Sequence, residues 1–274
     1  TREIGISLSC PVAVELIMKR MEPIRFTVSD NDEPISGYND IDAGLYYSLC
    51  QARELAYTIC QDRTLEIRQR AVLLLDFADA LQGKLKCRKT DRIIGNYKDK
   101  TYLLNRLEKL EKKYSSSKKT SDMLLKWLRL YDSLEHIKPE WQGILDVLTS
   151  YVKKGMSDVR DNAAAVNERS YEYEHLLVYY VYRYFLRAVF DGELSGKVKL
   201  ACTALIMQEL LGAAYCSRDG SFSFNTQITL MRIYSKETEH SEENLEVLYK
   251  NFKKNKAFSI RNYMGIILGS GLFV

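Results

Sequence analysis

The sequence predicts an all-α fold on three observations. First, only 4 prolines and 14 glycines occur in 274 residues, too few for the many turns of a β-sandwich or barrel. Second, apolar residues recur every three or four positions over long stretches, which is the period of an amphipathic helix. Third, 46% hydrophobic and 28% charged residues are typical of a folded globular protein. We therefore expect roughly nine to twelve helices, packed as an orthogonal bundle around one central helix.

The start of the chain predicts a linker with one short helix and a small extended element. Pro11 suits the first turn of a helix, where its missing N–H costs no hydrogen bond, and Pro23 ends that helix. The alternation in Ile24–Val28 indicates a short strand or an extended segment. We assign residues 1–39 to this linker and residues 40–274 to a helical domain.

Amphipathic stripes predict the helices in the first half of this domain. They lie at Ile41–Ile59, Ile67–Leu81, Leu103–Tyr114, Leu124–Leu134 and Trp141–Val152.

The second half contains the predicted central helix, residues 174–190. From Leu176 to Phe190 the only charged residues are Arg183 and Arg187, and a helix that is apolar nearly all round is usually buried. Shorter stripes predict further helices at Leu200–Tyr215, Gln227–Tyr234 and Leu245–Phe252. The tail from Tyr263 to Val274 carries no charge, which favours a docked terminal segment or a dimer contact.

Charge is uneven along the chain. Residues 84–119 hold thirteen Lys and Arg against four Asp and Glu, a net charge of +9 in a chain whose total is +4. This basic stretch indicates either a solvated helical hairpin or a docking surface for an acidic partner. We expect no nucleic-acid partner, because no nucleic-acid-binding motif accompanies it.

Several common chemistries lack their sequence signals. The closest pair of the six cysteines is ten residues apart and only three histidines occur, so we expect no zinc or iron in this chain. Phosphate-binding glycine motifs and the G-x-S-x-G motif are absent from the sequence. We find no signal peptide and no apolar run long enough to span a membrane. Because there is no secretory signal, we expect the cysteines to be reduced thiols in a cytoplasmic protein. Because there is no membrane-spanning run, we expect no membrane partner.

The first unusual constellation is a tyrosine-rich stretch, with six tyrosines between Tyr171 and Tyr184. Tyr180, Arg183 and Asp191 lie on one helical stripe. A buried Arg183 needs an acidic partner, and Asp191 and Glu209 are the candidates. The stretch indicates either a core helix with satisfied hydroxyls or an aromatic pocket for a lysine or a sulfonium cation.

The second constellation runs from Tyr234 to Asn244 and is rich in acids. Ser241 suits a helix N-cap, followed by acids that complement the helix dipole. The stretch therefore indicates either capping and surface charge, or an acid–base pair formed by Glu239 and His240 near a site.

These two constellations are predicted to meet in space. We expect Tyr180, Arg183 and Tyr184 to face the acid-rich stretch across one polar pocket, because buried Arg183 needs a carboxylate. The facing residues would be Glu239, His240 and Asn244.

The same stretches resemble the flagellin lysine N-methylase family. Leu8–Pro11 (LSCP) resembles the start of a family segment, from which Val12 and Val14 depart. The stretch Glu174–Leu211 resembles the family's long helical core, and IYSKETEHSEENLEVL, from Ile233 to Leu248, resembles its most specific signature.

The resemblance implies methyl transfer from S-adenosylmethionine to lysines of flagellin in the cytoplasm. It also implies an iron–sulfur cluster in a cysteine-rich region before Thr1, which Cys10 would be close enough to contact. Tyr180, Tyr184, Glu239 and His240 are then the candidate catalytic residues. The candidate residues for binding substrate or cofactor are Tyr179, Arg183, Asp191, Glu209 and Asn244. The alternatives are a non-catalytic docking module that uses the basic stretch, and a nucleic-acid-binding helical protein.

Overall fold

Helices form the regular structure in the computed structural model of the chain, which describes residues 6–26, 42–85, 87, 89–115, 120–156 and 169–269. Within these ranges there is no β-strand, so the prediction of an all-α fold is confirmed. Ile24–Phe26 has no regular structure. The rest of the predicted extended segment and the boundary between residues 39 and 40 lie outside the described residues.

The first half of the chain contributes α1 (Pro11–Lys19), α2 (Ala43–Cys60), α3 (Ile67–Leu85), α4 (Asp91–Lys98), α5 (Lys100–Tyr114), α6 (Thr120–Asp132) and α7 (Glu140–Lys153). The second half contributes α9 (Ser170–Tyr184), α10 (Ala188–Asp191), α11 (Leu194–Asp219), α12 (Phe224–Glu239), α13 (Glu242–Lys254) and α14 (Ile260–Gly269).

Side-chain caps fix several of the helix starts. Asp42 accepts a hydrogen bond from the backbone N–H of Leu45 at the start of α2, and Ser241 accepts one from Asn244 at the start of α13, both at 3.1 Å. Asp99 caps α5 in the same way. The sequence did not predict α4 as a separate helix, because no glycine or proline stands at this junction and the break depends on the Asp99 cap alone.

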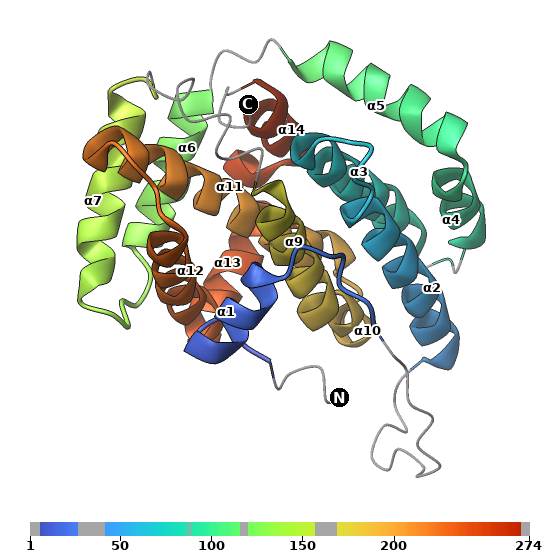
Figure 1. Cartoon of the computed structure of the whole chain (residues 1–274). Coiled ribbons are helices and arrows are strands. Elements are labelled where there is room, and N and C mark those ends of the chain that lie inside the picture. The colour runs from blue at the N-terminus through green and yellow to red at the C-terminus, as the bar shows by residue number, and fades with distance from the viewer. Residues whose placement is uncertain are drawn as a thin grey trace.

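The two central helices are α9 and α11, which pack along each other (Figure 1). Val178 and Val181 of α9 are buried, as is Leu186 just beyond it, which confirms a buried, tyrosine-rich helix at the centre. The buried carboxylate of Glu174 receives the guanidinium groups of Arg63 and Arg70. These ion pairs join α9 to the turn between α2 and α3 and to α3 itself.

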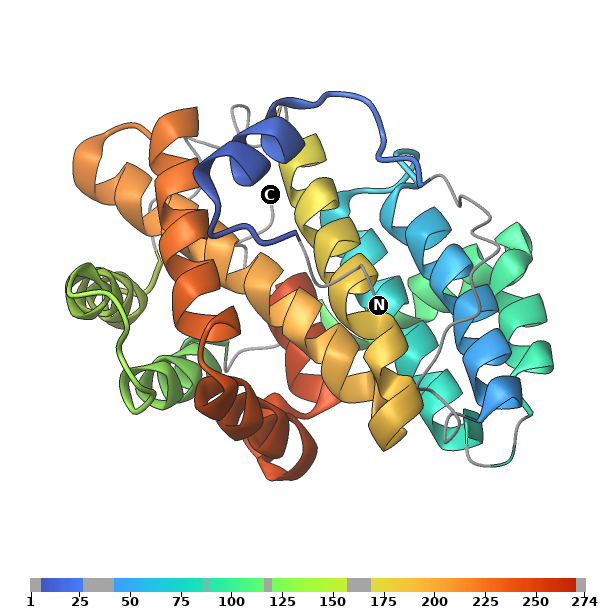
Figure 2. The ribbon, with the colours of Figure 1, turned by 90° about the horizontal axis from the view of Figure 1, so that it is seen from below.

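The remaining helices cover the central pair on two flanks. α2 and α3 pack on one side with α4 and α5 outside them, and α6, α7, α12 and α13 lie on the other (Figure 1). Figure 1 and Figure 2 both show α1 lying across α9 and α12, and α1 is in contact with both helices. The N-terminal helix is thereby brought beside two helices that lie far later in the sequence, Ser170–Tyr184 and Phe224–Glu239.

The predicted helix 174–190 is interrupted. α9 ends at Tyr184, a 3₁₀ turn follows at Phe185–Arg187, and α10 ends at Asp191. The residue that caps α10, Gly192, has the left-handed conformation with φ 68°. Glycine adopts this conformation without a steric penalty. The stripe that was expected to carry Tyr180, Arg183 and Asp191 along one helix is therefore broken after Tyr184.

α11 has the length and composition of a membrane span. The sequence did not predict this, because charged residues interrupt the apolar run within the helix. Its most apolar window has a mean hydropathy of 1.3, and 83% of that window is buried inside the protein. A helix surrounded by other helices of the same domain is apolar for packing, and α11 is such a core helix here.

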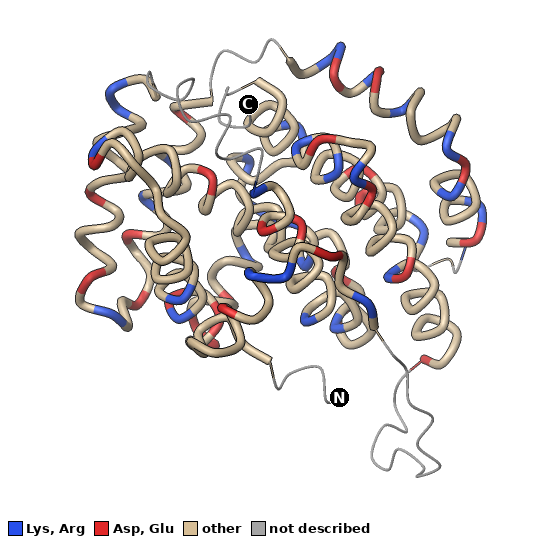
Figure 3. Tube along the Cα trace, in the orientation of Figure 1, with Lys and Arg blue, Asp and Glu red and all other residues tan. Residues whose placement is uncertain are grey.

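The described part of the basic stretch lies at the end of α3 and in α4 and α5, where Lys and Arg are interspersed with Asp and Glu (Figure 3). Residues 86, 88 and 116–119 of the stretch lie outside the described residues. Part of its charge is neutralised within the fold, because Arg106 pairs with Asp76 at 2.6 Å and Lys100 pairs with Asp62. The last helix, α14, packs on α3, α5 and α6 with Tyr263 fully buried. The described part of the uncharged tail is thus docked, and residues 270–274 lie outside the described ranges.

Candidate functional site at Glu239

A buried carboxylate lies between the ends of α9 and α12. Glu239 is the last residue of α12, and its side chain is fully buried. The helix dipole disfavours a negative charge at a C-terminus, and burial of an unpaired carboxylate is costly. Glu239 therefore requires several strong hydrogen-bond donors around it.

Three tyrosines of α9 supply most of those donors. The hydroxyls of Tyr179 and Tyr184 each donate to Oε2 of Glu239 at 2.8 Å. The hydroxyl of Tyr180 donates to Oε1 at 3.1 Å, and Ser235 donates to the same oxygen at 2.7 Å. The tyrosine-rich helix and the acid-rich stretch thus meet at one carboxylate.

Arg183 completes the coordination as a cation. Its Nε lies 3.1 Å from Oε2 of Glu239 and donates to the hydroxyl of Tyr184 at 3.1 Å. The Arg183 side chain is 12% exposed, so the ion pair lies at the edge of the core. This ion pair confirms the predicted meeting of Arg183 with Glu239, whereas Asp191 and Glu209, the other candidate partners, do not supply the acid.

The N-terminal segment closes over this group, which we call the Glu239 cluster (Tyr179, Tyr180, Arg183, Tyr184, Ser235 and Glu239). Arg183 donates to the carbonyl of Ile6, and the N–H of Leu8 donates to the Tyr179 hydroxyl at 3.3 Å. Next to the cluster, Nε2 of His240 is 2.6 Å from the Ser9 hydroxyl. All three family-like segments therefore converge on this one place.

The electrostatics keep the three phenols protonated. The pKa values of Tyr179, Tyr180 and Tyr184 are raised well above the usual value, first by burial and second by the negative charge of Glu239. A phenol with a raised pKa donates hydrogen bonds at neutral pH and does not accept a proton there. The geometry thus suits these tyrosines to positioning Glu239. His240, beside them, is exposed.

Asn244 does not face the cluster, contrary to the prediction. Its Nδ2 donates to the carbonyls of Glu135 and Glu237 at 2.8 and 2.7 Å, and its Oδ1 accepts from the N–H of Glu135 at 2.9 Å. Asn244 thereby joins the α12–α13 corner to the segment after α6. In the sequence, an asparagine that binds the backbone at a helix corner cannot be distinguished from one that lines a site. The predicted position of Asn244 was therefore wrong.

Asp191 and Glu209 also lie away from Arg183. Asp191 pairs with Lys197 at 2.6 Å. Glu209 is buried in α11, and its Oε1 has no hydrogen-bond partner among the residues that the structure describes. Burial alone raises the pKa of Glu209 to about 8.

Sequence reasoning missed Ser235 and the backbone of the N-terminal segment. Ser235 precedes Glu239 by four residues, so helical spacing could have identified it. The Ile6 carbonyl carries no side-chain signal at all.

The cysteines do not gather with other ligands. Cys10 is exposed at the N-cap of α1, and Cys60 and Cys202 are buried. Within the described ranges, no group of three or more His, Cys, Asp or Glu could hold a metal ion.

Comparison with known proteins identifies the family. No curated protein and no solved structure matches the chain. The family described as the FliB lysine N-methylase C-terminal domain matches residues 53–266, which is well over half of the chain and includes α9, α11 and α12. The chain therefore belongs to the FliB lysine N-methylase C-terminal domain family.

Proposed function

We propose that this chain is the helical part of a cytoplasmic enzyme that transfers methyl groups from S-adenosylmethionine to lysine side chains of flagellin. Family membership supports a lysine methylase component. The observation that carries the proposal further is the convergence of the three family-like segments on Glu239. Segments so far apart in sequence have no local reason to meet at a buried charge.

The cluster is proposed to position the reacting groups. A lysine ammonium must lose a proton before its nitrogen can attack a methyl group. Arg183 places a positive charge at the rim, and a nearby positive charge lowers the pKa of a lysine. His240, exposed beside the cluster, is the group proposed to take the proton.

The methyl donor would supply a sulfonium cation. Aromatic rings and a carboxylate attract such a cation, and the Glu239 cluster contains both. However, the guanidinium of Arg183 already holds the cationic position, and Tyr180 and Tyr184 are each 1% exposed. The described arrangement therefore does not fit a sulfonium against Glu239, and an iron–sulfur cluster likewise finds no set of grouped ligands within the described ranges.

A docking module is the second candidate, and the basic stretch favours it. Lys109, Lys112 and Lys113 are exposed on α5 and make no ion pair with any described residue. Such a surface attracts an acidic partner and loses affinity as salt rises.

The test uses bacterial cells from which the gene for this chain is deleted. Mass spectrometry of their flagellin is expected to show unmodified lysines, and restoring the gene is expected to restore methylation. Flagellin that stays methylated after deletion would overturn the proposal. Flagellin that binds the protein but is never methylated would favour the docking module.

A further inference from the structure

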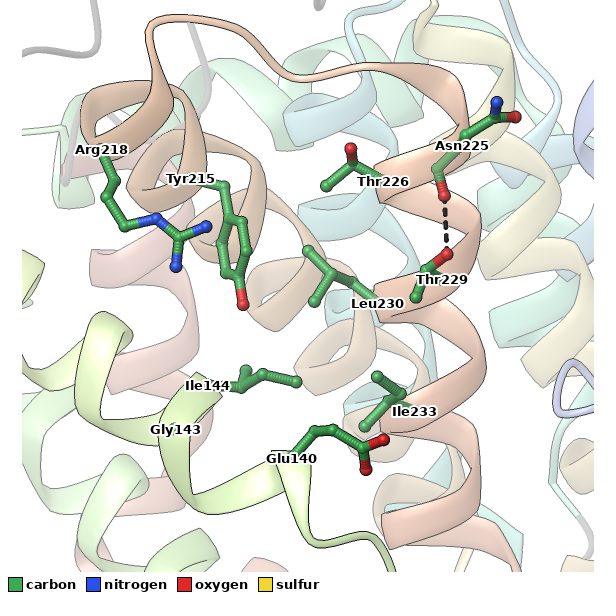
Figure 4. A pocket seen from close by; sticks show the side chains of 10 residues that line it. All are labelled: Glu140, Gly143, Ile144, Tyr215, Arg218, Asn225, Thr226, Thr229, Leu230 and Ile233. Atoms are coloured by element: carbon green, nitrogen blue, oxygen red, sulfur yellow. Dashed lines mark hydrogen bonds between the residues drawn. The ribbon is translucent and has the colours of Figure 1, made fainter.

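A groove lies between α7 and α12, and the C-terminal part of α11 closes one end. Its volume is about 590 Å³. Glu140 and Ile144 of α7 face Leu230 and Ile233 of α12, with Tyr215 and Arg218 at the α11 end (Figure 4).

The groove has an apolar floor. Ile144 and Leu230 are each 4% exposed, and Ile233 packs against the same core. A floor of aliphatic side chains suits the alkyl stem of a ligand, whose burial is favourable by the hydrophobic effect.

The polar groups around this floor differ in whether they are already satisfied. Arg218 pairs with Asp219 at 2.6 Å and lies over the ring of Tyr215 at 4.2 Å. The Thr229 hydroxyl donates to the carbonyl of Asn225 at 2.9 Å, the bond drawn in Figure 4. In contrast, the carboxylate of Glu140, an exposed side chain in the first turn of α7, has no hydrogen-bond or ion-pair partner among the described residues. The positive charge of Arg218 is therefore balanced by a neighbouring carboxylate, whereas the negative charge of Glu140 has no such partner.

An unpaired carboxylate beside an aliphatic floor matches a cation on an alkyl stem. We propose that this groove binds a lysine side chain of a protein partner, with the ammonium at Glu140 and the methylene chain over Ile144, Leu230 and Ile233. The choice of a protein partner rests on the proposed function. The chemistry of the ligand rests on the groove itself.

This site is separate from the Glu239 cluster. Ile233 and Glu239 are six residues apart on α12, which places their side chains about 120° apart around the helix at 3.6 residues per turn, and Glu239 faces α9. The groove would therefore hold a lysine of the partner rather than the one that reacts, and its occupancy would orient the partner on the enzyme.

The experiment is a nuclear magnetic resonance titration of the isotope-labelled chain with Nα-acetyl-lysine methylamide. The expected shifts are at the amides of Ile144, Thr226 and Thr229. Nα-acetyl-norleucine methylamide, which has an alkyl stem and no charge, is expected to bind at least threefold more weakly. Glu140→Gln is expected to weaken lysine binding about threefold, and Glu140→Lys more than tenfold. Glu242→Gln, an exposed change on α13, is the matched control and is expected to have no effect.

Three results would overturn the proposal: no shifts at these amides, equal binding of the norleucine and lysine compounds, or tighter binding of Nα-acetyl-aspartate methylamide through Arg218. The spectra report whether each variant is folded. Because binding is read without methyl transfer, loss of the proposed enzyme activity would leave this result unchanged, and the two failures are distinguishable.

Discussion

Replacing Glu239 by Gln tests whether the cluster is a strongly coupled buried group. Oε1 of Glu239 accepts from two donors, and Oε2 accepts from two phenols beside the guanidinium of Arg183. A Gln side chain replaces one of these oxygens by an amide nitrogen, which donates. Whichever way the amide turns, at least two buried donors lose their acceptor and the ion pair is lost.

The magnitude follows from these losses. Each buried donor left without a partner costs about 1–3 kcal/mol, and removing one partner of a buried ion pair costs about 3–5 kcal/mol. These contributions overlap, so we expect Glu239→Gln to lower the free energy of unfolding by about 3–5 kcal/mol. At 2–4 °C per kcal/mol for a chain of this size, the melting temperature should fall by roughly 6–20 °C.

The assay is urea and thermal unfolding of the purified chain, followed by circular dichroism at the helix band. Glu242→Gln, in the exposed first turn of α13, is the control and should cost less than about 1 kcal/mol. Tyr180→Phe removes one donor and should cost about 0.5–1.5 kcal/mol. A loss below about 1 kcal/mol for Glu239→Gln would refute the buried, coupled cluster.

Three further predictions concern the core. Glu209 has its pKa raised from 4.5 to about 8, so the folded state holds its proton more tightly than the unfolded state does. The free energy of unfolding should therefore fall as pH rises from about 4.5 to about 8. Glu209→Gln should remove this dependence on pH and should be more stable than the unchanged protein at pH 8. A dependence on pH that is unchanged in Glu209→Gln, measured by urea unfolding, would contradict this. Leu186→Ala should cost about 2–5 kcal/mol, measured by the same unfolding curves, because the side chain is buried; a cost below about 0.5 kcal/mol would place it at the surface. Both tryptophans, Trp127 and Trp141, are buried, so the native fluorescence maximum should lie at short wavelength and shift to the red on unfolding; a native maximum like that of the unfolded chain would argue against this packing.

The helices themselves could be predicted from the sequence, because burial and period are local properties. Stripes such as Ile67–Leu81 and Trp141–Val152 correspond to α3 and α7, and the tyrosine-rich helix through Val178 is buried at the centre. The break after Tyr184 could not be predicted. No glycine or proline stands between Tyr184 and Asp191 to mark it.

The candidate site was predictable in part. That Arg183 would meet an acid follows from its place in an apolar helix, and the acid-rich stretch supplied Glu239. The closing contact from the Ile6 carbonyl has no side-chain signature. Asn244 was misplaced because its capping role depends on where the helix corner falls in space.

The roles of the tyrosines changed once their surroundings were known. As residue types, Tyr180 and Tyr184 are able to serve as bases. Beside the Glu239 carboxylate, their raised pKa values make them donors instead. The surroundings of a tyrosine hydroxyl determine whether it donates a hydrogen bond or accepts a proton, and the spacing of residues in the sequence does not reveal those surroundings.

The central claim is that the Glu239 cluster serves methyl transfer and not only folding. The most direct measurement is the fraction of methylated flagellin lysines, by mass spectrometry, in deletion cells that express Tyr180→Phe at the normal protein level. Because this change should cost little stability, the account predicts folded protein with methylation reduced at least about tenfold, equivalent to about 1.4 kcal/mol of transition-state stabilisation. Normal methylation by Tyr180→Phe, together with losses in Glu239→Gln that only follow its unfolding, would contradict it and leave the cluster a structural ion pair.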